Sequence, residues 1–182
     1  GFELRNDPFD TYYFVDDDPT PHPIEKYQTD GLFDIGIDYI ANQWDPSSSF
    51  CMCISVEPPH TPFIAPDDLQ RIWEEKEIKL PPNFAAKDQQ ERELFIRNRK
   101  RYYAMVENLD QNVGRMVGFL RCQALAENTI ILFVSDHGEL NGSHGLRAKQ
   151  WPYEESIGIP LIVCDPSYSE RHGTTIEDPT CT

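Results

Sequence analysis

The fold of this chain is indicated by one stretch, Ile130-Ile131-Leu132-Phe133-Val134-Ser135-Asp136-His137-Gly138-Glu139. Its apolar first half predicts a buried strand, and polar side chains that can bind a metal follow where the strand stops. In an open α/β sheet, ligands bind beyond the carboxyl ends of the strands. The stretch therefore predicts both a strand of a sheet and a functional site at the end of that strand.

Further polar residues are expected at the same edge of the sheet. His144 and Lys149 lie in the Gly-rich, charged loop that follows the strand. His60 lies among the prolines of residues 57–62, which exclude helix and ladder and so predict a rigid loop after another strand. Taken singly, His60 and Lys149 are better explained as solvated surface side chains, and Asp136-His137 is equally well explained as a turn-forming Asp beside a surface His. Their convergence favours a shared site that binds an oxyanion beside a cation.

Apolar runs and helical patterns alternate along the chain. We expect an irregular surface segment over residues 1–26, helices over 29–40, 67–76 and 89–126, and strands over 50–56, 130–134 and 160–164. Thr29 is the expected cap of the first helix. The long helix carries an apolar stripe near period 3.6, formed by Tyr102, Val106, Leu109, Val113, Met116, Val117 and Leu120. This alternation predicts an α/β fold with a largely parallel sheet flanked by helices, its strands side by side or one strand apart.

Composition narrows the class of protein. The 182 residues, of which 39% are hydrophobic, fit one folded domain. A formal net charge of −15 argues against nucleic acid or an anionic membrane as the main partner, although it leaves an anionic substrate open. The sequence shows no apolar run long enough to span a membrane and no signal-peptide pattern. Localisation and oligomeric state are not indicated.

Several motifs, in order, strongly resemble the sulfatase family of the alkaline-phosphatase superfamily. The matching stretches are Glu57-Pro58-Pro59-His60-Thr61-Pro62, the helix around Tyr102–Gly114, Ser135–Gly145, Lys149, Tyr153-Glu154-Glu155-Ser156 and Ile159-Pro160-Leu161-Ile162-Val163. The resemblance covers about residues 27–166, and the order of its motifs makes it specific. It implies that residues 27–182 are part of a sulfatase catalytic domain with an alkaline-phosphatase-like sheet.

The resemblance also implies a role for each candidate residue. Asp136 and His137 match the pair that binds the family's divalent cation, usually calcium, although an imidazole leaves the identity of the metal open. Lys149 matches the lysine that contacts the sulfate. His60 matches the histidine near the ester oxygen, which helps to protonate the leaving alcohol. His144 is expected nearby as a candidate substrate-binding residue.

The chain departs from the family pattern in its missing pieces. None of its five cysteines begins a Cys-x-Pro-x-Arg motif, and no serine does so, so the chain has no formylglycine nucleophile. The family's N-terminal acidic pair, which completes the metal site, is also absent. We therefore expect a middle-to-C-terminal part of a sulfatase, with an incomplete metal site and no activity by itself.

Three functions remain open from the sequence. The leading interpretation is a parent protein that hydrolyses sulfate esters, either anionic small molecules or glycans. A phosphodiesterase or phosphonate monoester hydrolase of the same superfamily would share the Asp-His and Lys features. A non-catalytic domain could retain the fold and half of a metal site for binding or assembly. An upstream Cys/Ser-x-Pro-x-Arg motif would decide for the sulfatase.

Overall fold

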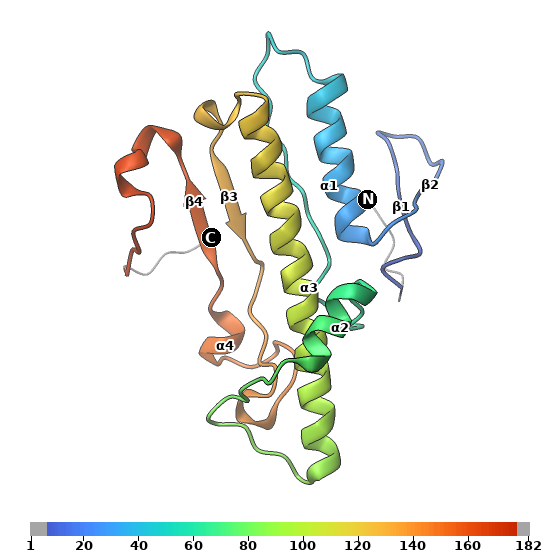
Figure 1. The fold of residues 1–182 in the computed structure, drawn as a ribbon, viewed down its shortest axis with the longest axis vertical. Helices are drawn as coiled ribbons and strands as arrows, with labels where there is room; N and C mark the ends of the chain where they lie inside the picture. Colours follow the sequence, from blue (N-terminus) through green and yellow to red (C-terminus); the bar gives the residue numbers. More distant parts are fainter. Residues whose placement is uncertain (1–6, 178–182) are drawn as a thin grey trace.

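The computed structural model describes residues 7–177 as a mixture of helices and short strands around one long helix (Figure 1). The helices are α1 (Gln28–Asp38), continued by a π-helical turn over Tyr39–Gln43, α2 (Asp67–Glu75), α3 (Gln89–Cys122) and α4 (Glu154–Ile157). The strands are β1 (Thr11–Tyr13), β2 (His22–Ile24), β3 (Ile131–Val134) and β4 (Leu161–Cys164). Short 3₁₀ turns cover Ala126–Asn128, Ser143–Gly145 and Pro166–Arg171.

Helix α3 is the spine against which α1, α2 and the loops pack. It begins where the sequence predicts, because the Asp88 carboxylate accepts a hydrogen bond from the backbone N–H of Glu91 at 2.8 Å. The Glu91 carboxylate accepts in turn from the backbone N–H of Lys87 at 2.7 Å. The helix ends at Cys122, before the predicted residue 126, and Ala124 then adopts a φ of 56°. This left-handed residue turns the chain toward β3.

The buried face of α3 differs from the predicted apolar stripe. Its fully buried residues are Phe95, Ala104, Met105, Asn108, Asn112 and Leu120. Val106 of the predicted stripe is 39% exposed, whereas Asn108 and Asn112 are buried. Both amides donate to a carboxylate oxygen of Asp30 in α1, at 2.8 and 2.6 Å. The α1–α3 contact is thus built on a buried polar network, which a count of apolar residues does not detect.

Helix α1 lies close to its neighbours through two glycines. A Cβ at Gly31 would approach Ile24 to 2.2 Å, and a Cβ at Gly36 would approach Ile54 to 2.9 Å. The predicted cap is wrong, because the helix begins after Tyr27 without a side-chain cap and Thr29 is fully buried. The segment predicted to be irregular contains β1 and β2, which pair antiparallel over three residues each.

Strands β3 and β4 are neighbours, as predicted, but they run antiparallel, with Ile131 opposite Cys164 and Val134 opposite Leu161. The largely parallel sheet is not found between residues 7 and 177, where both ladders are antiparallel. A parallel pair needs a crossover connection. The chain between β3 and β4 forms a 3₁₀ turn over Ser143–Gly145 and the four-residue helix α4, and it returns at the same edge. Residues 50–56, predicted as a strand, are not part of a ladder in this region.

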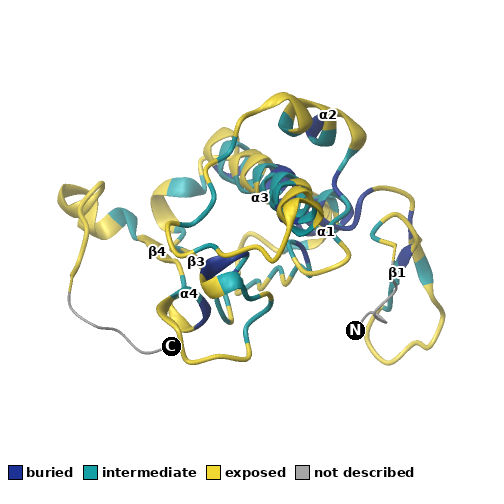
Figure 2. Cartoon of the chain, turned by 90° about the horizontal axis from the view of Figure 1, so that it is seen from below, coloured by how far each residue is buried: buried dark blue, intermediate teal, exposed yellow. Residues whose placement is uncertain are grey.

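The β3–β4 ribbon is exposed although its residues are apolar. Leu132 of β3 is 62% exposed and Ile162 of β4 is 61% exposed. Figure 2 shows β4 and the segment after it on the outside of the molecule, in the colour of exposed residues. By contrast, the core between α2 and α3 is closed around Leu69 and Met105. The ribbon therefore has the apolar composition of a buried sheet, but no layer of residues 7–177 buries it.

No helix within residues 7–177 has both the length and the apolar character that crossing a membrane requires.

Candidate functional site

The residues at the end of β3 form a tight polar turn. The Ser135 hydroxyl donates to the backbone carbonyl of His137 at 2.8 Å, and the backbone N–H of His137 donates to the Asp136 carboxylate at 3.0 Å. These bonds hold the turn while the Asp136 side chain remains 83% exposed. Asp136 thus presents a carboxylate to the space beyond the strand, as the sequence predicts.

His137 is oriented by its own neighbour. Its Nδ1 lies 2.7 Å from the carbonyl oxygen of Gly138, and since a carbonyl only accepts, Nδ1 carries the hydrogen. In the neutral form of this tautomer Nε2 keeps a lone pair, and Nε2 lies 3.3 Å from Oδ2 of Asp136. Two donor atoms at this separation can share one cation bound at about 2.0–2.4 Å.

Asp136 and His137 supply two donor atoms, which is fewer than a divalent cation needs. A divalent cation would need further ligands, because calcium takes about six to eight oxygens. In the part of the chain that the structure describes, no group of three or more His, Cys, Asp or Glu side chains is placed to hold a metal. The two donor atoms are chemically compatible with a divalent cation, but by themselves they do not complete its coordination.

The loop between β3 and β4 ties Lys149 to this turn. The backbone N–H of Gly138 donates to the carbonyl of Ser156 at 2.8 Å, and the Ser156 hydroxyl donates to the carbonyl of Lys149. The backbone N–H of Leu140 donates to the carbonyl of Ala148 at 3.0 Å. Ser156 therefore links the backbone of Lys149 to the segment that follows His137, because it bonds to both.

This loop, residues 135–158, is closely packed and locally strained. A Cβ at Gly138 would approach the carbonyl oxygen of Glu155 to 2.2 Å, so only glycine fits there. Three non-glycine residues have left-handed backbones, with φ of 44° at Asn141, 57° at His144 and 62° at Ala148. Such conformations persist where the surroundings over-determine them, and they concentrate at functional sites.

The His144 ring lies against the far arm of the same loop. It stacks on the Tyr153 ring, with centroids 3.9 Å apart and an angle of 15° between the planes. Its Nε2 lies 3.2 Å from the amide nitrogen of Asn83 and 3.6 Å from a carboxylate oxygen of Glu155. Hydrogen bonds from its own backbone N–H and from Asn83 lower the pKa of Glu155, and the charge of His144 adds to this effect.

His60 lies on the exposed loop that precedes α2. Its Nδ1 lies 2.7 Å from the carbonyl oxygen of Thr61 and so carries the hydrogen, which leaves Nε2 available as in His137. The loop is anchored to α3, because the ring of Phe63 packs edge-on against Tyr102 at 6.0 Å between centroids. Among residues 7–177, no hydrogen bond or ion pair joins His60 to Asp136 or Lys149.

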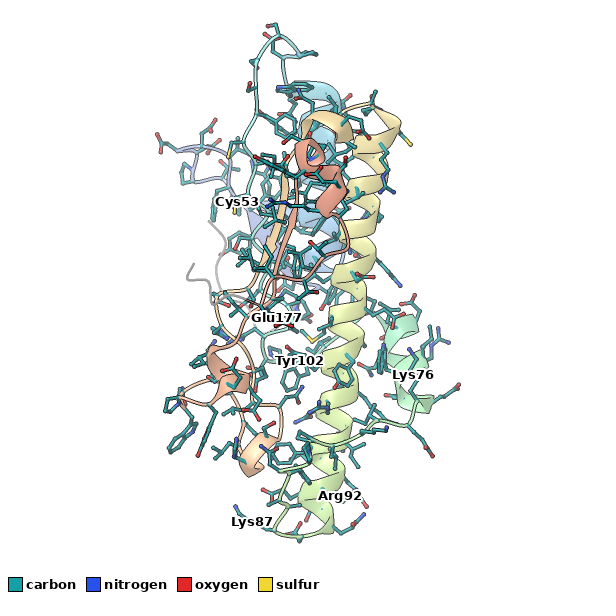
Figure 3. All side chains as sticks on the ribbon, turned by 90° about the vertical axis from the view of Figure 1, so that its left-hand side faces the viewer. Cys53, Lys76, Lys87, Arg92, Tyr102 and Glu177 are labelled. Carbon is teal, nitrogen blue, oxygen red and sulfur yellow. The ribbon has the colours of Figure 1, made fainter. Side chains whose placement is uncertain are left out.

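Tyr102 stands between the two loops. Burial and the negative charge of Glu139, which belongs to the 135–158 loop, raise the pKa of Tyr102. Figure 3 shows Tyr102 on the side of α3 that faces this loop, away from α2 and Lys76. The His60 loop and the end of β3 thus border the same residue of α3. In Figure 1, residues 51–56 and β3 run toward the same end of the molecule.

Sequence reasoning missed the residues that hold the loop from outside. Arg99 of α3 donates from a guanidinium nitrogen to the carbonyl of Asn141 at 2.8 Å. Asn83, from the irregular segment before α3, contacts His144 and Glu155. These contacts join positions far apart in the sequence, and neither Arg99 nor Asn83 belongs to a local pattern. Only Glu155, within the motif at residues 153–156, had a signal that could have found it.

Comparison with known proteins gives a consistent result. The sulfatase family matches residues 3–178. The ulvan-active sulfatase of Formosa agariphila is 28% identical over 170 residues, which are 92% of this chain and 33% of that protein. A structure of yidJ from Bacteroides fragilis, a candidate sulfatase, has a TM-score of 0.73 at 32% identity and covers 81% of this chain and 33% of that one.

A solved phosphonate monoester hydrolase shares the fold. The enzyme of Agrobacterium radiobacter has a TM-score of 0.63 at 22% identity, over 77% of this chain and 33% of that chain. The chain spans about a third of the length of these relatives.

Proposed function

This chain belongs to the sulfatase family, and we propose that its parent protein hydrolyses sulfate esters at a site to which the 135–158 loop contributes. One observation carries the proposal. The hydrogen bonds through Ser156 hold Lys149 beside the turn that presents Asp136 and His137, so a cationic side chain and two metal-capable donors share one loop. A sulfate ester needs this combination, because its reaction builds negative charge on oxygen.

We assign the roles as follows. Asp136 and His137 would supply two ligands to a divalent cation, for which the carboxylate favours calcium. When bound, that cation would neutralise charge on the sulfuryl oxygens. Lys149 would contact the same group as a point charge. His60 would protonate the departing ester oxygen from its imidazolium form, in which Nε2 as well as Nδ1 carries a hydrogen, and His144 remains a candidate for contact with substrate.

The nucleophile would come from another part of the parent protein. Residues 1–182 contain no Cys/Ser-x-Pro-x-Arg motif, and Lys149 and His60 cannot replace a covalent nucleophile. The substrate we propose is an anionic small molecule or glycan that carries a sulfate ester. With a net charge of −15, the chain as a whole would repel such a substrate, so attraction must come from Lys149 and the cation.

We also propose that the sheet of the complete protein is largely parallel, with β4 as an antiparallel strand beside β3. Two features support this proposal. Residues 51–56 run in the same direction as β3 and are not paired in a ladder within residues 7–177. Leu132 is apolar, as in strands that are buried on both faces, yet it is 62% exposed in this chain. Further strands and helices of the parent protein would pair with these segments and cover them.

The test is an assay of the full-length parent protein with calcium on 4-nitrophenyl sulfate and on a 4-nitrophenyl phosphonate monoester. We expect kcat/KM to favour the sulfate by about 100-fold or more, which is about 2.7 kcal/mol of differential transition-state binding. A preference for the phosphonate would instead support the hydrolase alternative. No turnover of either ester, with the protein folded and calcium present, would support a non-catalytic domain.

A further inference from the structure

We propose that His144 is a positioning residue, which closes the loop around Lys149 by fastening residue 144 to residues 153–155. This inference rests on the proposed function, because it deepens the role of Lys149. The His144 ring contacts Tyr153 and Glu155, and Lys149 lies between residue 144 and these two residues in the sequence. The ring thus bridges the two sides of the loop that carries the Lys149 ammonium group. A bridge of this kind limits where the Lys149 carbonyl and side chain can move.

Contacts on several sides fix the His144 ring. One face stacks on Tyr153 at 3.9 Å, while Nε2 faces the Asn83 amide at 3.2 Å and the Glu155 carboxylate at 3.6 Å. The Asn83 amide nitrogen also lies 3.3 Å from the same Glu155 oxygen, so the three side chains form a closed polar triangle. With one face on Tyr153 and Nε2 engaged by Asn83 and Glu155, only Nδ1 and the other face of the ring are left for contact with a substrate.

The backbone supports the same interpretation. His144 holds a φ of 57°, which a histidine adopts rarely and which the loop must therefore impose or compensate. Residues outside the loop also pack closely against the neighbouring turn, since a Cβ at Gly145 would approach the carbonyl oxygen of Ala85 to 2.9 Å. Residues 83–85 thus press on the turn at two points, through Asn83 on the ring and through Ala85 on the backbone.

Glu155 connects the His144 ring to the hydrogen bonds that hold Lys149. Ser156, directly after Glu155, accepts the backbone N–H of Gly138 and donates its hydroxyl to the Lys149 carbonyl. Fastening Glu155 therefore fixes the residue that joins Lys149 to the turn at Asp136. Loss of either member should loosen the same hydrogen bonds, so the two losses should not add.

The experiment compares His144→Ala, Glu155→Ala and the double variant with the wild type in the full-length protein. The first readout is kcat and KM for 4-nitrophenyl sulfate, and the second is amide hydrogen exchange of residues 140–148. We expect each single variant to lower kcat about tenfold with KM changed less than about twofold, and loop exchange to become about tenfold faster. The double variant should resemble either single one.

Two further variants act as controls. His144→Asn tolerates the left-handed backbone and keeps an amide toward Asn83, so it should recover part of the lost kcat. His22→Ala removes another stacked histidine, whose ring lies 5.2 Å from that of Tyr13 in the β1–β2 ribbon, and should change nothing in the loop.

The outcomes separate the two proposals. A rise in KM with unchanged kcat and unchanged exchange would make His144 a substrate contact and overturn the inference. Unchanged kinetics and exchange in His144→Ala would also overturn it. If the wild-type protein does not hydrolyse the aryl sulfate, the proposed function fails, while the exchange data still decide whether His144 closes the loop.

Discussion

The 135–158 loop and the β3–β4 ribbon adjoin each other in the chain, yet they are stabilised in different ways. The loop satisfies its polar groups internally, with Gly138 bonded to Ser156 and Leu140 bonded to Ala148. The ribbon pairs its two strands but leaves Leu132 and Ile162 more than half exposed. The loop thus pairs most of its backbone groups within nearby sequence and is supported from outside by Arg99 and Asn83, whereas the ribbon would be covered, under our proposal, by other parts of the parent protein.

This difference shows which parts of a catalytic domain are determined locally. A loop that carries chemistry must hold its groups in one geometry, and backbone hydrogen bonds within the loop achieve this. A central strand draws most of its stability from the layers on both faces, which lie far away in the sequence.

The largest effect is expected from substitution of Lys149. Lys149→Met should lower kcat of the full-length protein about 10²–10³-fold, because in the proposed site it would remove a charge that stabilises the developing negative oxygens. The free energy of unfolding should change little, since the backbone carbonyl, which accepts from Ser156, is kept.

Steady-state kinetics on 4-nitrophenyl sulfate measure this effect. Lys87→Met is the matched control, because the Lys87 side chain is 88% exposed and only 3.9 Å from a helical Glu91 partner. Equal losses in the two variants would show that general charge, and not the position of Lys149, matters.

The next effect concerns the packing of the loop. Gly138→Ala would place a methyl group 2.2 Å from the Glu155 carbonyl oxygen, so the 138–156 hydrogen bond must break or shift. We expect a loss of about 1–3 kcal/mol in the free energy of unfolding and a fall in kcat of about 10²-fold.

Denaturant unfolding and kinetics together measure this change. Gly118→Ala is the control, since nothing lies within 4 Å of a Cβ at this helical position. It should stabilise α3 by about 0.5–1 kcal/mol. If Gly138→Ala lowers neither the free energy of unfolding nor kcat more than Gly118→Ala does, the loop is not closely packed around Gly138.

A third change tests the ribbon. Leu132→Lys should alter the free energy of unfolding of the 182-residue chain by less than about 0.5 kcal/mol, because the side chain is 62% exposed. In the full-length protein the same change should cost about 1–3 kcal/mol, since the lysine would be buried by the added layers.

Met105→Ala provides the comparison for this test. Met105 is 1% exposed in the α2–α3 core, so its loss should cost about 2–5 kcal/mol in both the short and the full-length protein. A cost for Leu132→Lys that is equally small in both proteins would show that the ribbon is a native surface.

The smallest effect is a pH dependence. The pKa of Glu155 is lowered in the folded chain by hydrogen bonds, with a contribution from His144, so its carboxylate stabilises the loop above its unfolded pKa. That contribution is lost as the pH falls through the lowered folded pKa. Hydrogen exchange or loop NMR signals between about pH 3 and 6 should show loosening at the acid end. In Glu155→Gln this step should disappear, and an unchanged step would assign it to another group.

The local patterns predicted the elements that depend on local sequence. The apolar run at 130–134 and the polar residues after it formed β3 and an exposed Asp136, and the prolines before α2 formed the loop that carries His60. The direction of pairing between β3 and β4 was not predictable from periodicity, because an apolar run has the same pattern in either direction. It depended on the path of the connecting loop.

Contacts between distant residues were the other limit. The Asn83–His144 contact spans 61 positions, and no pattern of residues marks either end. The buried face of α3 was misjudged for a similar reason, since Asn112 is buried only because Asp30 of α1 accepts its amide. A polar residue on a helix can be assigned to the core only when its partner is known.

The most direct measurement is amide hydrogen exchange, residue by residue, on the 182-residue chain and on the full-length protein. In both, the amides of Gly138 and Leu140 should exchange at least about 100-fold more slowly than in an unfolded chain, because their hydrogen bonds lie within the loop. The amides of residues 51–56 should be protected only in the full-length protein. Unprotected loop amides in the shorter chain, or protected 51–56 amides in it, would contradict the account.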